Sequence, residues 1–390
     1  MTAWPIVAMG TVADWGSGGT PSRGKSEYYG GDIPWATISD LPDGPFEVTN
    51  ELITSEALQA SSTKLVPPGS VLIAMYGASI GKLGLPQCSM ATNQAIAFAA
   101  PFVELLDRNY LFRFLQSQKA AFVSAGVGGA QPNISQNLLK TWKIPLPPLP
   151  EQRRIAAILD HADVLRVKRR EALAQLEELT QAIFIDLFGD PATNPQQLPV
   201  VTIGEMLDSA NYGTSEKSGA TGKFPVLRMG NITYQGQIDL TDLKYMDLED
   251  AKVERFTVRA GDVVFNRTNS PDLVGKTAVY RGAEPLAYAG YLVRLRAKDD
   301  SAPEYISAFL NSRYGKAVLR GMCKSIVGMA NINAREVQSI KIPQPATVIL
   351  SAFNERVAAV EQNKAQHRTA LTELDDLFAS IQSRAFRGEL

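Results

Sequence analysis

Hydrophobic residues recur at heptad spacing along one uninterrupted stretch of the chain, residues 151–188. This stretch contains no glycine and no proline, whereas four prolines crowd residues 145–150 and Gly189-Asp190-Pro191 follows it. Proline removes a backbone donor and restricts the residue before it. We therefore predict an extended segment over residues 144–150 and a helix from Glu151 to Phe188, about 57 Å long at about 1.5 Å per residue.

The second half of the chain repeats the first half at an offset of 198 residues. Ile144-Pro145 returns as Ile342-Pro343, and Asn133-Ile134 returns as Asn331-Ile332. Downstream, identical residues stand without a gap at Arg170/Arg368, Ala172/Ala370, Leu173/Leu371, Leu176/Leu374, Leu179/Leu377, Ile183/Ile381 and Phe188/Phe386. The order is therefore domain, helix, domain, helix, and the helix of the second copy runs to the end of the chain.

Outside the two helices the pattern is one of short strands and Gly/Pro-rich turns. Val71–Met75 follows a Pro-Pro-Gly turn and is a continuous apolar run, typical of a buried strand. Gly261–Phe265 holds the same place in the second copy, and each domain ends with a helical pattern, over 110–122 and 305–319. These patterns predict an α+β fold with two strand-rich domains related by the repeat and separated by two long antiparallel coiled-coil helices.

Each predicted long helix carries a narrow apolar stripe with a cationic middle. The stripes are Leu159, Ala162, Arg166, Arg169, Leu173, Leu176, Thr180, Ile183, Leu187, and Val357, Val360, Lys364, His367, Leu371, Leu374, Phe378, Ile381, Ala385. A long helix with so narrow a stripe needs a partner for that face. We expect the two copies to pack antiparallel as a coiled coil; the alternative is that each helix only covers its own domain.

Composition adds little to this picture. The 390 residues suffice for two or three cores, no apolar run approaches the roughly 18 residues of a membrane span, and residues 1–5 lack the features of a signal peptide. One cysteine in each half, Cys88 and Cys323, fits reduced thiols in a cytoplasm. The net charge of −1 does not by itself indicate a nucleic-acid-binding protein. Only residues 191–343 have a net positive charge, with 19 Lys and Arg against 16 Asp and Glu.

Signals for catalysis are weak. The two histidines, His161 and His367, fall inside the predicted helices and have no metal-ligand neighbours, so we expect no metal site and no cofactor. Gly275-Lys276-Thr277 ends a segment that lacks one glycine of a phosphate-binding loop, and a strand rather than the required helix should follow it. Because the first copy keeps Gly81-Lys82, we interpret Gly-Lys as a turn shared by both domains.

Polar loops that follow the predicted strands are better candidates for function. The glycine-rich loop of residues 16–23 offers small residues and backbone donors suited to close approach by a phosphate. Residues 266–270 place arginine and asparagine, which suit guanine and adenine edges, directly after a strand. The candidate DNA-binding residues are Ser17, Thr20, Ser22, Arg23, Tyr76, Ser79, Lys82, Tyr212, Thr214, Arg228, Asn266, Arg267, Thr268, Asn269 and Lys276. For Arg267 the alternative is an exposed surface arginine paired with Asp272, and any of these residues can equally be an ordinary turn residue.

The chain resembles the specificity subunits of type I restriction–modification systems. The resemblance rests on Pro147-Pro148-Leu149-Pro150-Glu151-Gln152-Arg153-Arg154-Ile155 at the start of a long helix after a strand-rich domain, and on the ending Ser383-Arg384-Ala385-Phe386-Arg387-Gly388-Glu389-Leu390. It covers the whole chain. One departure is that Ile349-Leu350 replaces Glu151-Gln152 in the second copy, which leaves open whether the two helix beginnings dock partners equivalently.

This resemblance implies a subunit without catalytic activity of its own. It implies target recognition domains at residues 1–146 and 191–343, which each read one half of a bipartite site in double-stranded DNA. It also implies a central helical region at 147–190 and a C-terminal one at 344–390, which set the spacer between the half-sites. The implied partners are two modification subunits, which methylate adenine with S-adenosylmethionine, and restriction subunits.

Two other functions compete with this interpretation. A nuclease or methyltransferase is disfavoured, because a DNA adenine methyltransferase needs an Asn/Asp-Pro-Pro-aromatic motif and Asn194-Pro195-Gln196-Gln197 does not supply it. A helical scaffold whose outer domains bind protein is the main alternative, and it predicts no sequence-specific DNA binding.

The cationic residues in the middle of both stripes should lower the stability of the helix pair but fix the register in which the two helices pack. Polar residues in a helix seam cost stability but fix the pairing, so Arg166, Arg169, Lys364 and His367 should meet or have acidic or water partners. Replacing all four by leucine should raise the melting temperature and loosen the register, measured by thermal unfolding and by cysteine cross-linking across the seam. A clear loss of stability would contradict this account.

Overall fold

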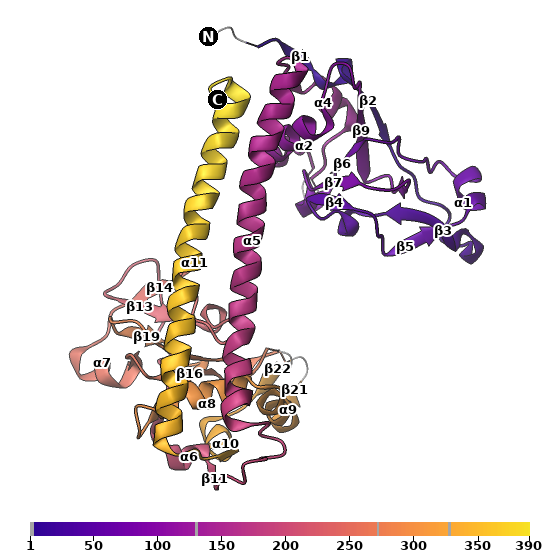
Figure 1. Ribbon diagram of the computed structural model, residues 1–390. Coiled ribbons are helices and arrows are strands. Elements are labelled where there is room, and N and C mark those ends of the chain that lie inside the picture. Colours follow the sequence, from indigo (N-terminus) through magenta and orange to yellow (C-terminus); the bar gives the residue numbers. More distant parts are fainter. Residues whose placement is uncertain (1–3, 129–131, 271–272, 327–328) are drawn as a thin grey trace. The chain divides into compact units, whose positions relative to one another are not determined.

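The structure, a computed structural model, describes residues 4–128, 132–270, 273–326 and 329–390. The chain divides into two compact units, one made of Met1–Arg169 with Ala370–Leu390 and the other of Arg170–Thr369. Each unit holds one strand-rich domain and a part of both long helices (Figure 1). The division therefore falls inside the helices, and each unit is a domain together with the stretch of helix pair that packs on it.

Unit 1 is built around a five-stranded sheet of order β2-β9-β6-β7-β4. Its strands are β2 (Ala13–Ser17), β9 (Ile96–Pro101), β6 (Val71–Ala74), β7 (Leu83–Pro86) and β4 (Gly44–Phe46). All four residues of β6 are buried, as its apolar run predicts. A second sheet holds β5 (Glu51–Ile53), β3 (Tyr29–Ala36) and β8 (Ala91–Thr92), and α1 (Ser55–Gln59), α2 (Arg108–Ser117), α3 (Lys119–Ala125) and α4 (Gln136–Thr141) complete the domain.

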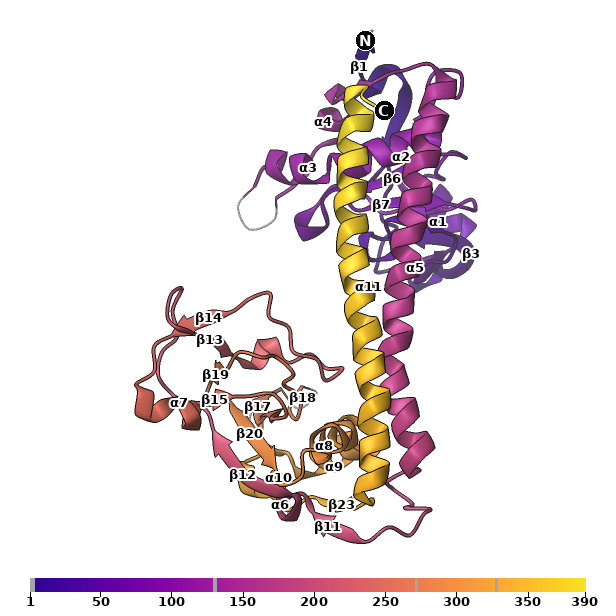
Figure 2. The same ribbon diagram turned by 60° about the vertical axis from the view of Figure 1, so that its left-hand side comes forward.

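Unit 2 repeats this plan with a four-stranded sheet of order β12-β20-β16-β18. Its strands are β12 (Leu207–Tyr212), β20 (Leu292–Ala297), β16 (Val263–Asn266) and β18 (Thr277–Val279). A second sheet holds β14 (Lys244–Met246), β13 (Phe224–Leu227), β19 (Leu286–Tyr288) and β15 (Thr257–Val258), and a third holds β17 (Thr268–Asn269), β22 (Met329–Asn331) and β21 (Lys324–Ile326). The helices are α6 (Ile203–Met206), α7 (Asp250–Phe256), α8 (Ala302–Asn311), α9 (Arg313–Met322) and α10 (Ala334–Gln338). Figure 2 shows α8 and α9 beside one another.

The single late helix expected in each domain is in fact a pair, α2 with α3 and α8 with α9. In unit 2 the break falls at Ser312, whose extended backbone interrupts the helix and whose hydroxyl accepts a hydrogen bond from the N–H of Gly315. A serine at this position caps a new helix. Apolar periodicity alone does not reveal such a break, because both helices of each pair bury one face in the same core.

The repeated Lys-Ile-Pro segment forms the same strand in both units. Lys143–Pro145 is β10 and pairs with β1 (Ile6–Ala8), and Lys341–Pro343 is β23 and pairs with β11 (Val200–Thr202). The hydroxyl of Tyr110 donates to the carbonyl of Pro145 at 2.9 Å, and that of Tyr305 donates to Pro343 at 2.5 Å. Burial raises the pKa of both tyrosines, so each phenol remains a donor that ties its domain to the start of a long helix.

The long helices are α5 (Leu149–Phe188) and α11 (Thr347–Arg387). Helix α5 begins at Leu149 rather than at Glu151, because the first turn of a helix tolerates a proline such as Pro150, whose missing N–H has no helical partner there. Gly189 ends α5 with a φ of 75°, as the sequence indicates.

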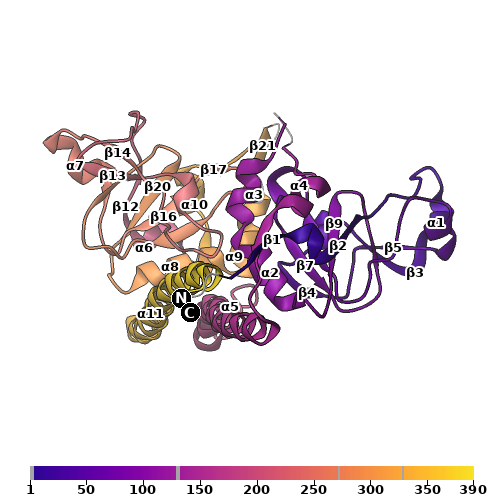
Figure 3. The ribbon, with the colours of Figure 1, turned by 90° about the horizontal axis from the view of Figure 1, so that it is seen from above.

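The two helices pack antiparallel within each unit (Figures 1 and 3). In unit 1, Leu159 of α5 shares a core with Phe378 and Ala385 of α11. In unit 2, Ile183 of α5 packs on the core that includes Val357. All nine residues of each predicted stripe are buried or half-buried, so the predicted seam is confirmed.

The helices also complete the core of each domain, which the stripe does not predict. Phe184 and Phe188 lie beside the stripe, and both are buried in unit 2. The ring of Phe184 stacks on Tyr305 of α8 at 5.5 Å, and Phe188 meets Phe353 of α11 at 5.3 Å. The sequence presents two alternatives, that the long helices pair with each other or that each covers its own domain. In the structure the helices do both.

The stripe cations Arg166 and Lys364 form ion pairs with acidic residues. In unit 1, Asp163 lies 2.8 Å from both Arg166 and Arg113 of α2, and Arg166 also reaches Asp375 of α11 at 2.5 Å. In unit 2, Glu361 lies 2.8 Å from Lys364 and 3.9 Å from Arg281 of the adjoining domain. Although burial raises the pKa of Glu361, hydrogen bonds and charges from Lys364 and Arg281 leave it below its usual value. The two units therefore repeat one arrangement, in which a helix carboxylate joins a seam cation to an arginine of the domain.

The structure explains why Ile349-Leu350 replaces Glu151-Gln152 at the start of the second long helix. Gln152 is fully buried; its side-chain oxygen accepts from the N–H of Asp107 at 2.8 Å, and its amide donates to the carbonyls of Leu105 and Pro147. Leu350 holds the equivalent place in unit 2 and is buried in an apolar core. The first helix beginning is thus fixed by hydrogen bonds, and the second by apolar packing.

Replacing Gln152 by leucine, the residue of the second copy, should destabilise unit 1 by roughly 2–5 kcal/mol. One backbone N–H and two carbonyls would lose their partner, and an unsatisfied buried group costs about 1–3 kcal/mol. Denaturant unfolding would measure the loss. Gln175→Leu, on the exposed side of α5, is the matched control and should change stability by less than about 0.5 kcal/mol; equal stability of both variants would disprove the role of Gln152.

Candidate nucleic-acid interface

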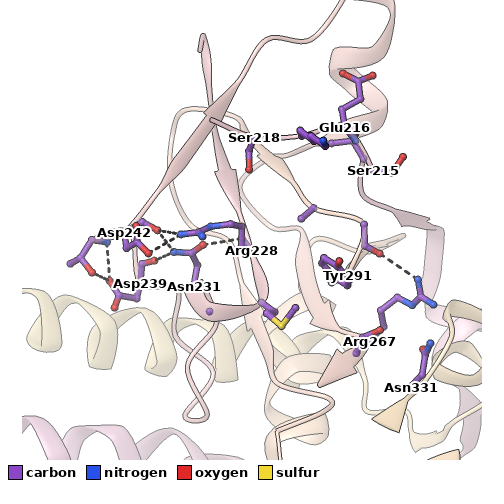
Figure 4. Close-up of a pocket in the computed structure, with 18 residues that line it drawn as sticks. Ser215, Glu216, Ser218, Arg228, Asn231, Asp239, Asp242, Arg267, Tyr291 and Asn331 are labelled. Carbon is purple, nitrogen blue, oxygen red and sulfur yellow. Dashed lines mark hydrogen bonds and ion pairs between the residues drawn. The ribbon is translucent and has the colours of Figure 1, made fainter. Parts of the chain in front are cut away.

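A cleft of about 1070 Å³ lies in unit 2, where the loops that follow four strands converge (Figure 4). The loops after β12, β13, β16 and β19 supply its walls, and Asn331 of β22 adds to them. Four of the predicted residues line this cleft: Thr214, Arg228, Arg267 and Thr268. The strand ends of two sheets therefore bring together side chains that lie far apart in the sequence.

Close approach of two backbones forms one wall of the cleft. A Cβ atom at Gly213 would lie 2.3 Å from the carbonyl oxygens of Tyr288 and Ala289, so only glycine fits there. The N–H of Thr214 donates to Tyr288 at 2.9 Å, and the N–H of Gly290 donates back to Thr214 at 2.8 Å. These bonds fix the loops after β12 and β19 against each other before any ligand arrives.

An aromatic ring positions Arg267, and its guanidinium has an N–H donor without an acceptor among the described residues. Its guanidinium lies over the ring of Tyr212 at 5.0 Å and donates a long hydrogen bond of 3.4 Å to the carbonyl of Gly290. The Nε–H is buried and, among the described residues, has no acceptor. The tyrosine is itself held, because its hydroxyl accepts from the N–H of Ala334 at 2.9 Å. Asp272, the other expected partner of Arg267, lies outside the described residues.

Arg228 occupies another wall and is engaged by an acidic residue that the sequence did not single out. It lies 2.8 Å from the carboxylate of Asp242 and 3.0 Å from the carbonyl of the same residue. The carboxylate is 83 % exposed, and the Nε–H of Arg228 is buried without a partner among the described residues. The amide of Asn231 donates to the carbonyl of Asp242 as well, which holds this loop in place. No periodic signal connects residue 242 with residue 228, so only the fold reveals the pair.

Two predicted residues of unit 2 are buried and do not offer their side chains at the surface. Asn266 was expected after the strand, but β16 extends through it by pairing with Leu292, and its side chain is 0 % exposed with no partner for either amide atom among the described residues. Lys276 was predicted to be a DNA-binding residue on the shared turn, but it is only 8 % exposed, and its ammonium donates to the carbonyl of Met229 at 3.0 Å. Burial lowers its pKa. Asn269 is half-buried in β17 and accepts from the N–H of Ser270.

The glycine-rich loop of unit 1 uses its backbone donors internally, which corrects the expectation that they face a phosphate. The N–H of Gly18 donates to Ile96, and that of Gly19 donates to Thr92. A Cβ atom at Gly18 would lie 1.8 Å from the carbonyl oxygen of Thr92, just as Gly213 meets the loop after β19. Glycine serves close packing of two loops in both units.

The predicted side chains of unit 1 lie in two segments. Arg23 is exposed, pairs with Glu51 at 2.5 Å and lies over the rings of Tyr29 and Trp35. In the same segment, Ser17 ends β2, the hydroxyl of Thr20 donates to Gln94, and Ser22 is exposed. In the other, Tyr76 is exposed, while Ser79 and Lys82 are half-buried. Among the described residues of unit 1, no hydrogen bond joins the two segments.

The Gly-Lys turn is confirmed in both units. Gly81 and Gly275 have φ values of 78° and 75°, which favour glycine, and each is followed by a strand, β7 or β18, rather than by the helix of a phosphate-binding loop. The described residues contain no group of three or more His, Cys, Asp and Glu suited to a metal ion. None of the helices in the described part of the chain has the length and apolarity that crossing a membrane requires.

Residues 1–178 match the family model described as the type I restriction modification DNA specificity domain. This part of the chain is therefore similar to that family. The chain is 25 % identical to the EcoKI specificity subunit of Escherichia coli strain K12 over 99 % of this chain and 89 % of that protein. It is 23 % identical to the StySPI specificity subunit of Salmonella potsdam, again over 99 % of this chain and 89 % of that protein.

The fold agrees with a solved structure of such a subunit. The S subunit of a type I restriction–modification system from M. genitalium superposes with a TM-score of 0.57 at 16 % identity, over 99 % of this chain and 96 % of that one. Two strand-rich domains joined by two long helices are therefore an architecture that this family uses.

Proposed function

We propose that this chain is the DNA-recognition subunit of a type I restriction–modification complex. Each strand-rich domain reads one half of a bipartite site in double-stranded DNA, and the helix pair sets the spacer and docks two modification subunits, to which restriction subunits are added. The chain itself performs no catalysis, and it acts in the cytoplasm. The observation that carries this proposal is the cleft of unit 2, where two arginines from the loops after different strands line a common space.

The chemistry of the cleft suits base edges better than a reacting substrate. Arginine forms two hydrogen bonds with the O6 and N7 atoms of guanine, and Asn331 and Thr268 add short polar groups to the same walls. The two domains also share a framework but differ in their loops, which suits two half-sites of different sequence. In unit 1, Thr37 after β3 stands at the position that Arg228 occupies in unit 2, and Met75 after β6 stands at the position of Arg267. For the same reason we propose that residues 1–146 and 191–343 are the recognition domains and that residues 147–190 and 344–390 are the helical regions.

Arg267 is the best single candidate for base readout. Its guanidinium is already oriented by Tyr212, and the hydrogen bond to Gly290 that it gives up when it turns to a base is long. An arginine paired with guanine contributes about 1–3 kcal/mol of discrimination, whereas a phosphate contact weakens all sequences alike. Arg267→Ala should therefore relax one position of one half-site and leave the other half-site unchanged.

The measurement is binding of the assembled methyltransferase to a duplex library randomised in both half-sites. Arg259→Ala is the matched control, because Arg259 precedes β16 whereas Arg267 follows it; this variant should keep the preferred sequence. If Arg267→Ala also keeps it, base readout by Arg267 is wrong even when affinity falls. If the wild-type complex shows no sequence preference at all, the scaffold alternative is favoured instead.

Helix length should set the spacer between the half-sites. Four residues inserted after Ala174 and four after Thr372 lengthen each helix by roughly 6 Å, which corresponds to about two base pairs at roughly 3.4 Å per step. The preferred spacer should grow by that amount while both half-sites stay the same. Binding to duplexes of graded spacer length would show this, with the insertion in one helix alone as a control that should disrupt the seam; an unchanged spacer in the double insertion would refute the idea.

A further inference from the structure

Unit 2 contains three neighbouring cations for which the described residues supply no acidic partner: Lys276 before β18, and Lys316 and Arg320 on α9. We call them the basic cluster. The ammonium of Lys316 donates to the carbonyl of Gly275 at 2.9 Å, and that of Lys276 donates to the carbonyl of Met229 at 3.0 Å. Among the described residues, no carboxylate lies within ion-pair distance of any of the three. Since an ammonium has three donors, the half-buried Lys316 keeps donors for a further acceptor, whereas Lys276, which is buried, contributes its positive charge.

The charges of the cluster act on one another. Burial and, after it, the positive charges of Arg320 and Lys276 together lower the pKa of Lys316 to about 8. The ring of Tyr234, itself partly exposed, lies 5.4 Å from the ammonium of Lys316 and is the aromatic group beside it. A desolvated charge without a counter-charge is costly, so binding of an anion would relieve both the burial and the repulsion.

At the same place in unit 1, the lysine that approaches the turn has an acidic partner. There the Gly81-Lys82 turn lies against α3, whose Lys119 approaches Gly81 and lies 3.5 Å from the carboxylate of Asp43. In unit 2 the equivalent Gly275 meets Leu319 of α9, and no carboxylate of the described residues accompanies the cluster. Within the described residues, the two units therefore differ in whether the cation beside the Gly-Lys turn has an acidic partner.

We propose that the basic cluster binds a phosphate of the DNA backbone, beside the cleft that reads the bases. The proposal rests on the proposed function. Met229, whose carbonyl holds Lys276, also lines the cleft, so the cluster adjoins the space where base edges would enter. A duplex read at its base edges also places its phosphates against the surrounding surface, and such contacts fix its register. The cluster thus supplies local positive charge that the net charge of −1 conceals.

Salt dependence of DNA binding tests the contact directly. Each phosphate contact that is lost should lower the slope of log affinity against log salt by about 0.9. Lys316→Gln and Arg320→Gln in the assembled methyltransferase should therefore weaken binding to specific and random duplexes alike, lower the slope, and leave the preferred sequence unchanged. Lys298→Gln, whose lysine instead bonds the carbonyl of Glu205, removes the same charge elsewhere and should keep the slope.

A pH series gives a second readout that an ordinary surface lysine does not provide. Because the phosphate favours the charged ammonium, wild-type affinity should fall as pH rises from 7 to 9 through the pKa of Lys316. Lys316→Arg keeps a charge that does not titrate in this range, so this variant should lose that pH dependence. The groups that face Lys316 are Lys276, Arg320 and Tyr234.

Several results would overturn the assignment. Unchanged slopes in both glutamine variants would do so, and Arg320→Gln keeps this outcome decisive if the more buried Lys316 proves necessary for folding. Loss of assembly with the modification subunits at an unchanged slope would mean that the anion is an acidic protein segment. If the wild-type complex binds specific and random DNA equally, the proposed function fails, while the slope still decides whether the cluster contacts phosphate.

Discussion

The packing of α5 against α11 is the interaction on which both units depend. In unit 1 the core includes Leu159 from one helix and Phe378 and Ala385 from the other, and in unit 2 it includes Phe184, Phe353 and Val357. A helix with so narrow an apolar stripe is not stable alone, and neither domain buries its core without the helices. The pairing therefore forms the seam and completes both domains at once.

Ion pairs and hydrogen bonds then fix the position of each helix on its domain, which apolar packing alone does not specify. Asp163 with Arg166, and Glu361 with Lys364, place the same ion pair at equivalent points of the two helices, and an arginine from each domain joins it. Because the carboxylate lies on the helix and the arginine lies in the domain, a shift of the helix against the domain would separate these two charges. Gln152 adds a second constraint to unit 1 alone, so the two halves share a frame but not every means of holding it.

The frame could be predicted from the sequence because repetition and periodicity are visible in a single chain. The offset of 198 residues, the stripes, the buried strand at Val71–Ala74 and the Gly-Lys turns are all present in the structure. The helix pairs α2/α3 and α8/α9 were missed, because both members bury one face and a single serine separates the second pair. Thr214, Arg228, Arg267 and Thr268 do meet at one cleft, but Asp242 and Tyr291 join them only through the fold. The burial of Asn266 and Lys276 follows from strand pairing and loop packing, neither of which leaves a mark on composition or spacing.

The division of the chain into units also bears on how the protein folds during synthesis. Unit 2 consists of one continuous segment, Arg170–Thr369, whereas unit 1 joins Met1–Arg169 to Ala370–Leu390. Phe378 and Ala385, which the core of unit 1 contains, emerge from the ribosome long after the rest of that unit. Domains commonly fold in the order in which they are made, but here the first domain to be synthesised is the last whose core can close.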